Sequence, residues 1–164
     1  MPVTDIKIRD YQRSDAKDVN RIAVSAFSEF CNHYQDWPAM LAGLSKTSDL
    51  SSTGEVIIAE FQNRLAGAVA YFGPHSRKAP FFDPQWAVIR MLVVDPEFRG
   101  KGIGRALSKE CIARAKRDGS PIIALHTSPI MTVALPMYLR MGFVKAYDAP
   151  PIFGVAYAVY TKSL

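Results

Sequence analysis

Residues 92–107 read Leu92-Val93-Val94-Asp95-Pro96-Glu97-Phe98-Arg99-Gly100-Lys101-Gly102-Ile103-Gly104-Arg105-Ala106-Leu107, and this stretch indicates the fold more directly than any other part of the sequence. The apolar run that ends at Val94 predicts a buried strand, and the glycine-rich turn at 100–104 leads into a helix. Glycine allows positive φ and close approach of the main chain, and the free N–H groups at a helix N-terminus favour a bound anion. Arg99, Lys101 and Arg105 add positive charge beside the turn. The stretch therefore predicts a loop that binds a phosphate group.

The spacing of the glycines separates this loop from two other phosphate-binding loops. A dinucleotide-binding turn has the pattern Gly-x-Gly-x-x-Gly, whereas Gly100, Gly102 and Gly104 alternate. A Walker loop ends in Gly-Lys followed by Ser or Thr, but here Lys101 is followed by a glycine. The remaining alternative is a turn whose glycines serve packing alone, which the neighbouring cations disfavour.

The segments on either side of the loop predict a strand, a helix and a second strand. Residues 86–94 form a nearly unbroken β-prone run, interrupted only by Arg90, which predicts a central strand buried on both faces. Residues 122–126 predict the next buried strand. Because the connections are short, the two strands should be parallel neighbours joined by a right-handed crossover. The helix between them is expected to bury one apolar row, formed by Ile103, Leu107, Cys111 and Ala115.

After this unit the sequence predicts one helix and two final strands. Ser128-Pro129 is a typical helix start, and Gly142 is a typical stop. Pro136 lies between them, so the helix should be kinked, or its regular part should begin late. The strands are expected at 143–147 and 155–162, with Pro150 and Pro151 in the loop between them.

The first half of the chain shows further local patterns. Ser14 is a candidate N-cap for an amphipathic helix over 15–30, and a shorter helix is expected from Trp37-Pro38 to about residue 44. Residues 73–84 contain three prolines and a glycine, and they predict a surface loop that is either a wall of a substrate pocket or an ordinary connector. Three β-prone segments complete this half: 6–9, 55–60 and 65–72, the last two forming a hairpin with a polar tip at 62–64.

Composition and charge narrow the class of protein. The 164 residues, 49% hydrophobic and 21% charged, suit a single domain over residues 1–164. The formal net charge of +5 favours an anionic partner, but the cations are spread along the chain and form no basic arm, so we expect no nucleic-acid binding. The chain begins without a signal-peptide pattern, and no apolar run is long enough to span a bilayer. Its two cysteines lack the spacing of a metal site. We therefore expect a soluble, cytoplasmic protein without metal or membrane binding.

Two motifs together resemble a known family. Arg99-x-x-Gly102-x-Gly104, preceded by Leu92-x-Val94-x-Pro96, looks like the pyrophosphate motif of the GCN5-related N-acetyltransferase (GNAT) family. Ala134-x-x-x-Tyr138-x-x-x-Gly142-Phe143 resembles the second signature of that family at the expected spacing. The resemblance implies a single-domain α/β fold whose mixed, twisted sheet has a splayed central parallel pair flanked by helices. It also implies that acetyl-CoA is the cosubstrate and that the acetyl group is transferred directly to a primary amine.

The same resemblance implies where acetyl-CoA binds. In the family fold the pantetheine arm fills a V-shaped slot between the two parallel strands, and its amides pair with main-chain groups of the first strand. An N–H group near Leu92 would polarise the thioester carbonyl. The implied cofactor-binding residues are Leu92, Val93, Val94, Arg99, Gly100, Lys101, Gly102, Ile103, Gly104 and Arg105.

For catalysis, the resemblance implies a general acid but leaves the base open. Tyr138 matches the tyrosine that often protonates the departing sulfur of coenzyme A. The alternative is that Tyr138 is a buried tyrosine whose hydroxyl only completes a hydrogen-bond network. Many relatives carry a glutamate at the position of Val88, and this departure removes the simplest base. His126, at the end of the second parallel strand, is the preferred candidate because its reference pKa suits proton transfer, with a structural role as the alternative. The other candidates are Glu60, Asp83, His75 and an ordered water.

Several alternatives follow from the same residues. Val88 and Met131, where relatives often have an asparagine that contacts the cofactor, make a catalytically inactive acyl-CoA binding or sensing module conceivable. A nucleic-acid binder would use the basic stretch from Arg99 onward. The acceptor, a small-molecule or peptide amine, is not identified, and a homodimer is an open alternative because dimers are common in such proteins. Four residues near the second helix are candidates for acceptor recognition or for the core: His33, Tyr34, Asp36 and Trp37.

Overall fold

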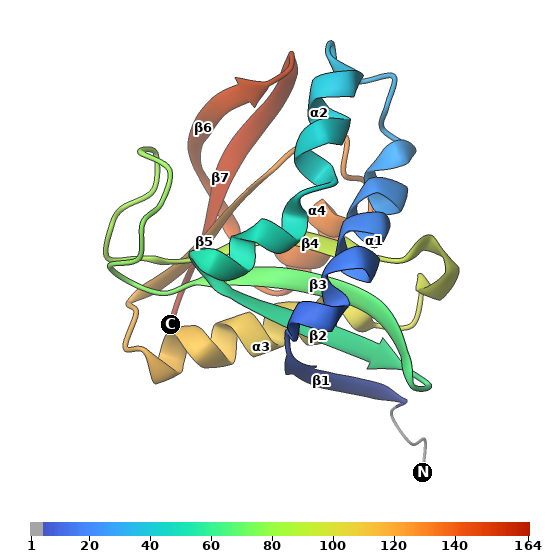
Figure 1. Ribbon diagram of the computed structural model, residues 1–164. Helices are drawn as coiled ribbons and strands as arrows, with labels where there is room; N and C mark the ends of the chain where they lie inside the picture. Colours follow the sequence, from blue (N-terminus) through green and yellow to red (C-terminus); the bar gives the residue numbers. More distant parts are fainter. Residues whose placement is uncertain (1–4) are drawn as a thin grey trace.

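The computed structural model describes residues 5–164, which form one seven-stranded mixed sheet (Figure 1). The strands lie in the order β1-β2-β3-β4-β5-β7-β6, with β4 and β5 parallel and the other neighbouring pairs antiparallel. The expected mixed sheet with a parallel pair at its centre is therefore confirmed. The strands are β1 Ile6–Asp10, β2 Glu55–Phe61, β3 Arg64–Phe72, β4 Ala87–Val94, β5 Ile122–Thr127, β6 Val144–Ile152 and β7 Val155–Ser163.

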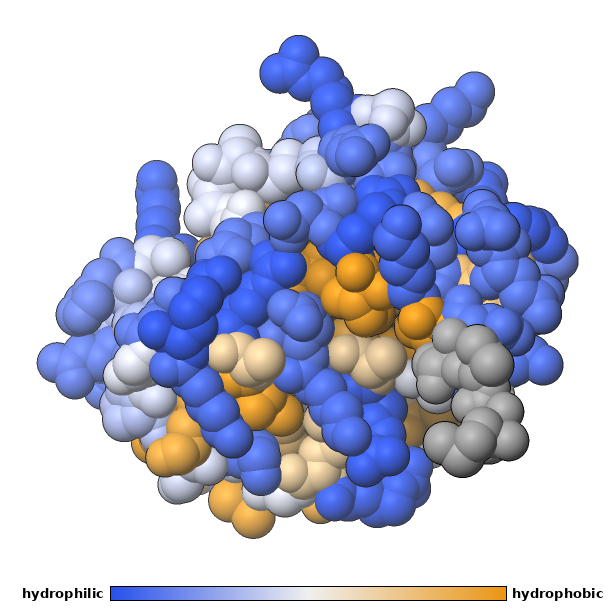
Figure 2. Space-filling view, turned by 90° about the horizontal axis from the view of Figure 1, so that it is seen from below, coloured by the Kyte–Doolittle hydropathy of each residue, from blue (hydrophilic) through white to orange (hydrophobic). Residues whose placement is uncertain are grey.

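Helices cover both faces of the sheet (Figure 1). α1 (Ala16–Ser28) and α2 (Trp37–Leu44) pack on one face, and α3 (Ile103–Arg117) and α4 (Ala134–Arg140) pack on the other. The apolar row predicted for α3 is confirmed, because its members are at most 1% exposed. Burial of one large aliphatic side chain contributes about 1.5–3 kcal/mol relative to exposure, so this row holds α3 on the sheet. Seen from below, the outer surface here is mostly hydrophilic, with hydrophobic atoms between the polar side chains (Figure 2).

The start of α1 differs from the prediction. Ser14 was expected to cap it, but residues Arg13–Asp15 form a 3₁₀ turn and α1 begins at Ala16. The carboxylate of Asp15 accepts a hydrogen bond from the Gln12 main-chain N–H at 2.8 Å, and it also pairs with Arg9 at 2.8 Å. Asp15 therefore holds this turn, which takes the place of a helix start capped by Ser14.

The helix expected from Ser128 begins later than predicted. Residues 128–133 form turns, in which the Ser128 hydroxyl accepts from the Ile130 N–H at 3.3 Å, and α4 starts at Ala134. Pro136 then lies in the first helical turn, where its missing N–H costs no intrahelical hydrogen bond. The late start is thus one of the two outcomes expected from Pro136. The prediction that Ser128 caps the helix was wrong.

The loop predicted around Pro150 and Pro151 is also wrong, because both prolines lie within β6. β6 is an edge strand, and its pairing with β7 is irregular between Ala149 and Ile152. An edge position tolerates proline because one side of the strand needs no donor. The chain turns instead at Phe153 and Gly154, both with positive φ, at 42° and 81°. The hairpin predicted between β2 and β3, and the loop over 73–84, are confirmed.

The central parallel pair separates soon after it begins. β4 and β5 pair at Ala87 with Ile123 and at Val88 with Ala124, and β4 then continues to Val94 without further pairing to β5. The prediction that β4 is buried on both faces holds for Ala87 to Ile89, whereas Arg90 is exposed and Leu92 is partly exposed. The reason is that the second half of the strand borders an open slot.

Candidate functional site

A β-bulge in β4 stands at the mouth of the slot. Arg90 pairs with Ala70 and Val93 pairs with Ala68, so Met91 and Leu92 lie opposite a single residue of β3. Met91 has φ of 55°, an uncommon value for a residue with a side chain. Bulges re-aim side chains and interrupt pairing next to active sites. No sequence signal marks this bulge, because the position is not a glycine.

The glycine-rich loop presents its main chain to open space. Gly100 and Gly102 have φ of 77° and 83°, and a Cβ added to either would meet nothing within 4 Å. Gly102 is the N-cap of α3, so the free N–H groups of the first turn lie next to it. This arrangement is the one that favours an anion at a helix N-terminus.

A cavity of about 710 Å³ extends from this loop along β4. Its walls come from α1, β4, the loop and α4. Of the ten predicted cofactor-binding residues, nine line it, namely Leu92, Val93, Val94, Arg99, Gly100, Gly102, Ile103, Gly104 and Arg105. The exception is Lys101, whose ammonium lies 5.8 Å from the centre of the Phe61 ring and not in the cavity wall.

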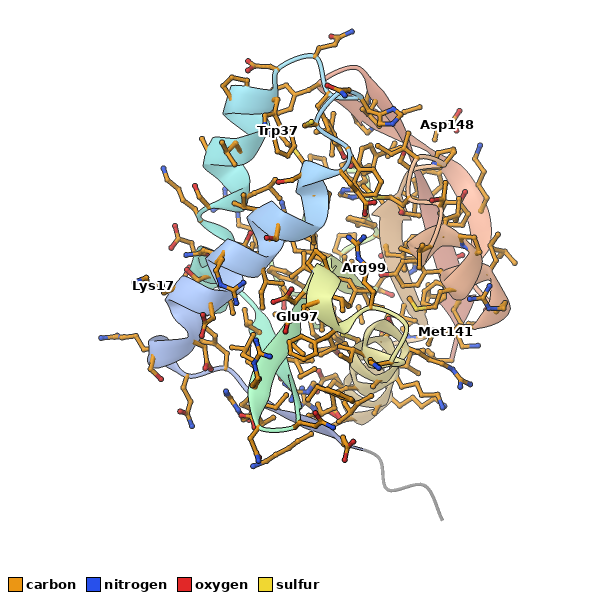
Figure 3. All side chains as sticks on the ribbon, turned by 90° about the vertical axis from the view of Figure 1, so that its right-hand side faces the viewer. Lys17, Trp37, Glu97, Arg99, Met141 and Asp148 are labelled. Atoms are coloured by element: carbon orange, nitrogen blue, oxygen red, sulfur yellow. The ribbon has the colours of Figure 1, made fainter. Side chains whose placement is uncertain are left out.

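The cations around this cavity differ in their partners. The Arg99 guanidinium pairs with Glu29 at 2.7 Å and reaches the Ala26 carbonyl at 3.4 Å, so it ties the loop to the end of α1. Arg105 and Arg140 line the cavity and are exposed. Arg140, in the last turn of α4, was missed by the sequence analysis because no local pattern connects it to the loop. Figure 3 shows Arg99 and Met141, the residue after Arg140, on the same side of the molecule.

Two further cavities continue the slot past Leu92. The first, of about 460 Å³, shares Phe27, Leu92 and Met131 with the large cavity. The second, of about 470 Å³, shares Arg90 and His126 with the first. The three cavities therefore lie next to one another in a row from the glycine loop to the 73–84 loop, and we refer to this row of cavities as the channel. We refer to the two smaller ones together as the acceptor cavities.

Tyr138 lies at the wall of this channel. It is 4% exposed, lines the first acceptor cavity, and packs edge-on against Phe143 with ring centres 5.6 Å apart. Burial raises the pKa of its hydroxyl well above the usual value, and Cys111 adds to the effect. Tyr138 is therefore protonated at neutral pH and can donate a proton or a hydrogen bond.

His126 lines both acceptor cavities from the end of β5. Its ring packs against Phe81, Phe82 and Tyr157, with centre distances of 5.3, 5.8 and 5.3 Å. Its Nδ1 atom is buried and has no hydrogen-bond partner among residues 5–164. Burial, and to a lesser degree the charge of Arg90, lowers the pKa of His126 to about 4. The imidazole is therefore neutral at neutral pH, with a lone pair available.

The other candidate bases lie outside the cavity walls. Glu60 is ion-paired with Arg9 at 2.5 Å, and the Asp83 carboxylate accepts from the Gln85 N–H at 2.8 Å. His75 lies in the 73–84 loop with φ of 68°. Val88 is buried at 2% exposure and carries no ionisable group.

The four residues suggested for acceptor recognition near α2 also lie outside these walls. Tyr34 is buried, and its hydroxyl shares a hydrogen bond of 2.5 Å with Tyr157. Asp36 caps α2 by accepting from the Ala39 N–H at 3.0 Å. Trp37 packs against the core, and His33 lies in the segment before α2. Tyr34 and Trp37 thus belong to the core, which was the alternative that the sequence allowed, whereas Asp36 is a helix cap and His33 is exposed.

Within residues 5–164, no cluster of three or more His, Cys, Asp or Glu side chains is arranged to hold a metal ion. Among the described helices, none has the length and apolar character needed to cross a membrane.

Comparison with known proteins places the chain among acetyltransferases. The model of the acetyltransferase (GNAT) family matches residues 16–143. N-acetyltransferase 8F1 of Rattus norvegicus is 33% identical over 109 residues, which cover 64% of this chain and 46% of that protein. The matched segments cover between 25% and 46% of the curated relatives' own length.

Solved structures show the same fold. A GCN5-related N-acetyltransferase from Rhodopseudomonas palustris superposes with a TM-score of 0.75 at 21% identity, over 100% of this chain and 99% of that one. A GNAT family acetyltransferase from Elizabethkingia anophelis, solved with acetyl-CoA bound, gives a TM-score of 0.68 at 19% identity, over 98% and 99% of the two chains.

Proposed function

Because the chain belongs to the GNAT acetyltransferase family, we propose that it is an enzyme that transfers the acetyl group of acetyl-CoA directly to a primary amine. The observation that carries this proposal is the row of three adjacent cavities. One end is a glycine loop suited to a pyrophosphate, and the other end is a pair of cavities large enough for a small molecule. The two parts meet at Leu92, on the β4 bulge.

The residues of the large cavity fit coenzyme A. Gly100 and Gly102 leave space on their Cβ side and face no protein atom within 4 Å, and the first turn of α3 offers free N–H groups. Arg105 and Arg140 supply positive charge for phosphate groups, while Arg99 fixes the loop through Glu29. The second half of β4 is unpaired on its β5 side and offers main-chain groups there to the amides of the pantetheine arm.

Direct transfer agrees with the state of the cysteines. When bound, acetyl-CoA supplies a thioester that a neutral amine can attack. Cys111 is fully buried, and burial raises the pKa of its thiol well above the usual value, so it is protonated and shielded. Cys31 does not line the channel. Neither thiol is therefore placed to carry the acetyl group as an intermediate.

Tyr138 and His126 are proposed to move the protons. Tyr138 is protonated at neutral pH and lines the channel, so it is placed to protonate the leaving thiolate. His126 is neutral and accepts the proton that the amine releases as it attacks. A pKa of about 4 makes it a weak base, so the amine must enter uncharged. For an amine of pKa about 10.4 this costs roughly 4–5 kcal/mol at neutral pH.

The experiment that tests the proposal is a panel of amines incubated with acetyl-CoA, with release of free thiol and formation of the acetylated amine both measured. The panel spans amino acids, polyamines, aminoglycosides and peptides. Transfer to at least one of them supports the enzyme. Tight binding of acetyl-CoA without transfer to any amine would support the inactive binding module instead.

A further inference from the structure

The charges in the acceptor cavities are all of one sign. The first cavity contains Lys46 and Arg90, and the second contains Arg77, Lys78 and Arg90. Neither wall includes an Asp or Glu side chain from the described part of the chain. A cationic group on an acceptor molecule would be repelled by these side chains, whereas an anionic group would be attracted.

Of these cations, Arg90 is placed best to bind an acceptor. It lines both cavities, is exposed, and makes no hydrogen bond or ion pair through its side chain with residues 5–164. Lys78, in contrast, donates to the carbonyls of Gly73 at 2.7 Å, Ser76 at 3.0 Å and Pro84 at 3.2 Å, so all three of its donors are used to hold the loop. A free, planar guanidinium matches the two oxygens of a carboxylate.

The second cavity also has an apolar wall that is partly aromatic. Phe81 and Phe82 lie 4.7 Å apart, centre to centre, and line the second cavity together with Phe72 and Pro151. The Tyr147 hydroxyl donates to the Phe81 carbonyl, which ties this part of the loop to β6. The loop is therefore held in place, and the cavity of about 470 Å³ suits the apolar body of a small molecule.

The position of Arg90 along β4 fits the length of such a molecule. Arg90 precedes Leu92 by two residues, so their Cα atoms are at most about 7 Å apart along a strand. Leu92 is where the acceptor cavities meet the proposed acetyl-CoA site. An amine at Leu92 and an anionic group at Arg90 can therefore belong to one small compound.

We propose that the acceptor is a small amine that also carries a carboxylate, which Arg90 binds, with an apolar body against Phe81 and Phe82. A planar guanidinium matches the two oxygens of a carboxylate, and phosphate-bearing amines are the competing acceptors in the test below. This inference rests on the proposed acetyl transfer, because it names the acceptor of that reaction. It disfavours polyamines and aminoglycosides, which would bring further positive charge beside Arg90.

The test compares acceptors paired by the presence or absence of a carboxylate. Each amino acid of an apolar series is paired with its amide, as in phenylalanine and phenylalaninamide. For both, kcat/KM for acetylation is measured and expressed per neutral amine, because an amide lowers the pKa of the amine beside it. We expect the acid to exceed the amide by at least about tenfold, the size of a charge-assisted hydrogen bond. Arg90→Gln should bring this ratio close to one by lowering the value for the acid, and Arg90→Lys should retain part of it. Lys109→Gln, an exposed residue of α3 outside the cavities, controls for the loss of one charge.

A binding arm separates failure of this inference from failure of the proposed enzyme. The same acids and amides are titrated by calorimetry into the protein saturated with coenzyme A. Binding of the acids that Arg90→Gln weakens, without transfer to any amine, would support a carboxylate site at Arg90 and overturn the proposed enzyme. Transfer to amides or to spermidine that equals transfer to the acids would overturn the inference and leave the enzyme standing. Preference for aminoalkyl phosphates, or acids that neither bind nor react, would also overturn it.

Discussion

The two ends of the channel are built in different ways. The cofactor end is formed mainly by one continuous stretch, 92–105, to which α1 and α4 add walls. The acceptor end draws on segments far apart in the sequence, including α2, the 73–84 loop, β5 and the turn between β6 and β7. A site within one stretch leaves a motif in the sequence, whereas a site assembled from distant segments leaves none. The difference explains why acetyl-CoA could be named from the sequence and the acceptor could not.

The largest expected effect lies where the two ends meet. Replacing Tyr138 by Phe should lower kcat by about 100-fold or more, because a general acid contributes about 10²–10⁴-fold. Affinity for acetyl-CoA, measured by calorimetry, should stay within about twofold, because the glycine loop is untouched.

Tyr71→Phe is the matched control. Tyr71 is also buried, but it lies outside the cavity walls, and its hydroxyl donates to Asp118 at 2.8 Å. Full turnover in Tyr138→Phe, or an equal loss in both variants, would remove Tyr138 from the reaction.

The next effect concerns the acceptor end and the stability of the fold. Unfolded His126 titrates near pH 6.5, but burial lowers the folded pKa to about 4. The folded protein thus binds fewer protons between these values. The contribution of the neutral imidazole to the free energy of unfolding is fully present above about pH 6.5. This contribution is lost as the pH falls to about 4. Because the imidazole is partly exposed, we expect a loss of about 2 kcal/mol from this residue, less than the full shift implies.

Denaturant unfolding of wild type and His126→Gln at pH 8, 6 and 4.5 checks this expectation. The value at pH 8 serves as each protein's own reference, and the wild type should lose more stability on acidification than the variant. Parallel pH dependences would mean that His126 is protonated freely in the folded protein.

At the cofactor end, Gly102→Ala should weaken acetyl-CoA binding about tenfold, because the methyl group takes up open space beside the loop and the positive φ is strained for alanine. Gly119→Ala is a close control. Gly119 also has positive φ, at 73° against 83°, and its Cβ would also meet nothing within 4 Å, but it lies at the other end of α3. The two variants should lose similar stability, about 1 kcal/mol, while binding should weaken in Gly102→Ala alone. Equal binding in both would show that the loop does not contact the cofactor.

The smallest effect is expected for Arg140→Gln, about threefold weaker binding of acetyl-CoA, since one exposed charge contributes under about 1 kcal/mol. The loss should shrink as salt is added. Lys109→Gln removes one exposed charge from α3 outside the cavity and should leave the affinity as it is. If the two variants behave alike, Arg140 acts only through the net charge.

The sequence predicted the fold best where periodicity and burial agree. The row from Ile103 to Ala115 follows helical spacing, and the structure buries all of it. Predictions from single residues were weaker: Ser14 and Ser128 have the chemistry of helix caps, but Asp15 and Pro136 decide where α1 and α4 begin. The preference of serine for a helix start is thus outweighed by an ion pair in one case and by the missing N–H of a proline in the other. Neither can be seen at the serine position itself.

The site shows the same limit. The glycine loop could be predicted because its function depends on main-chain geometry that glycine encodes directly. The direction of the Lys101 side chain could not be predicted, because its ammonium lies over the ring of Phe61, which belongs to a strand far away in the sequence. Arg140 and the bulge at Met91 also depend on tertiary packing. Residues of this kind are found only when the fold brings them together.

The most direct measurement is calorimetric titration of acetyl-CoA, and of free coenzyme A, into the purified protein. We predict one binding site per chain with a dissociation constant below about 1 mM, the upper end of ordinary substrate affinities. Absence of binding by both compounds to folded protein would contradict the assignment of the 92–105 stretch, and with it the function proposed for the channel.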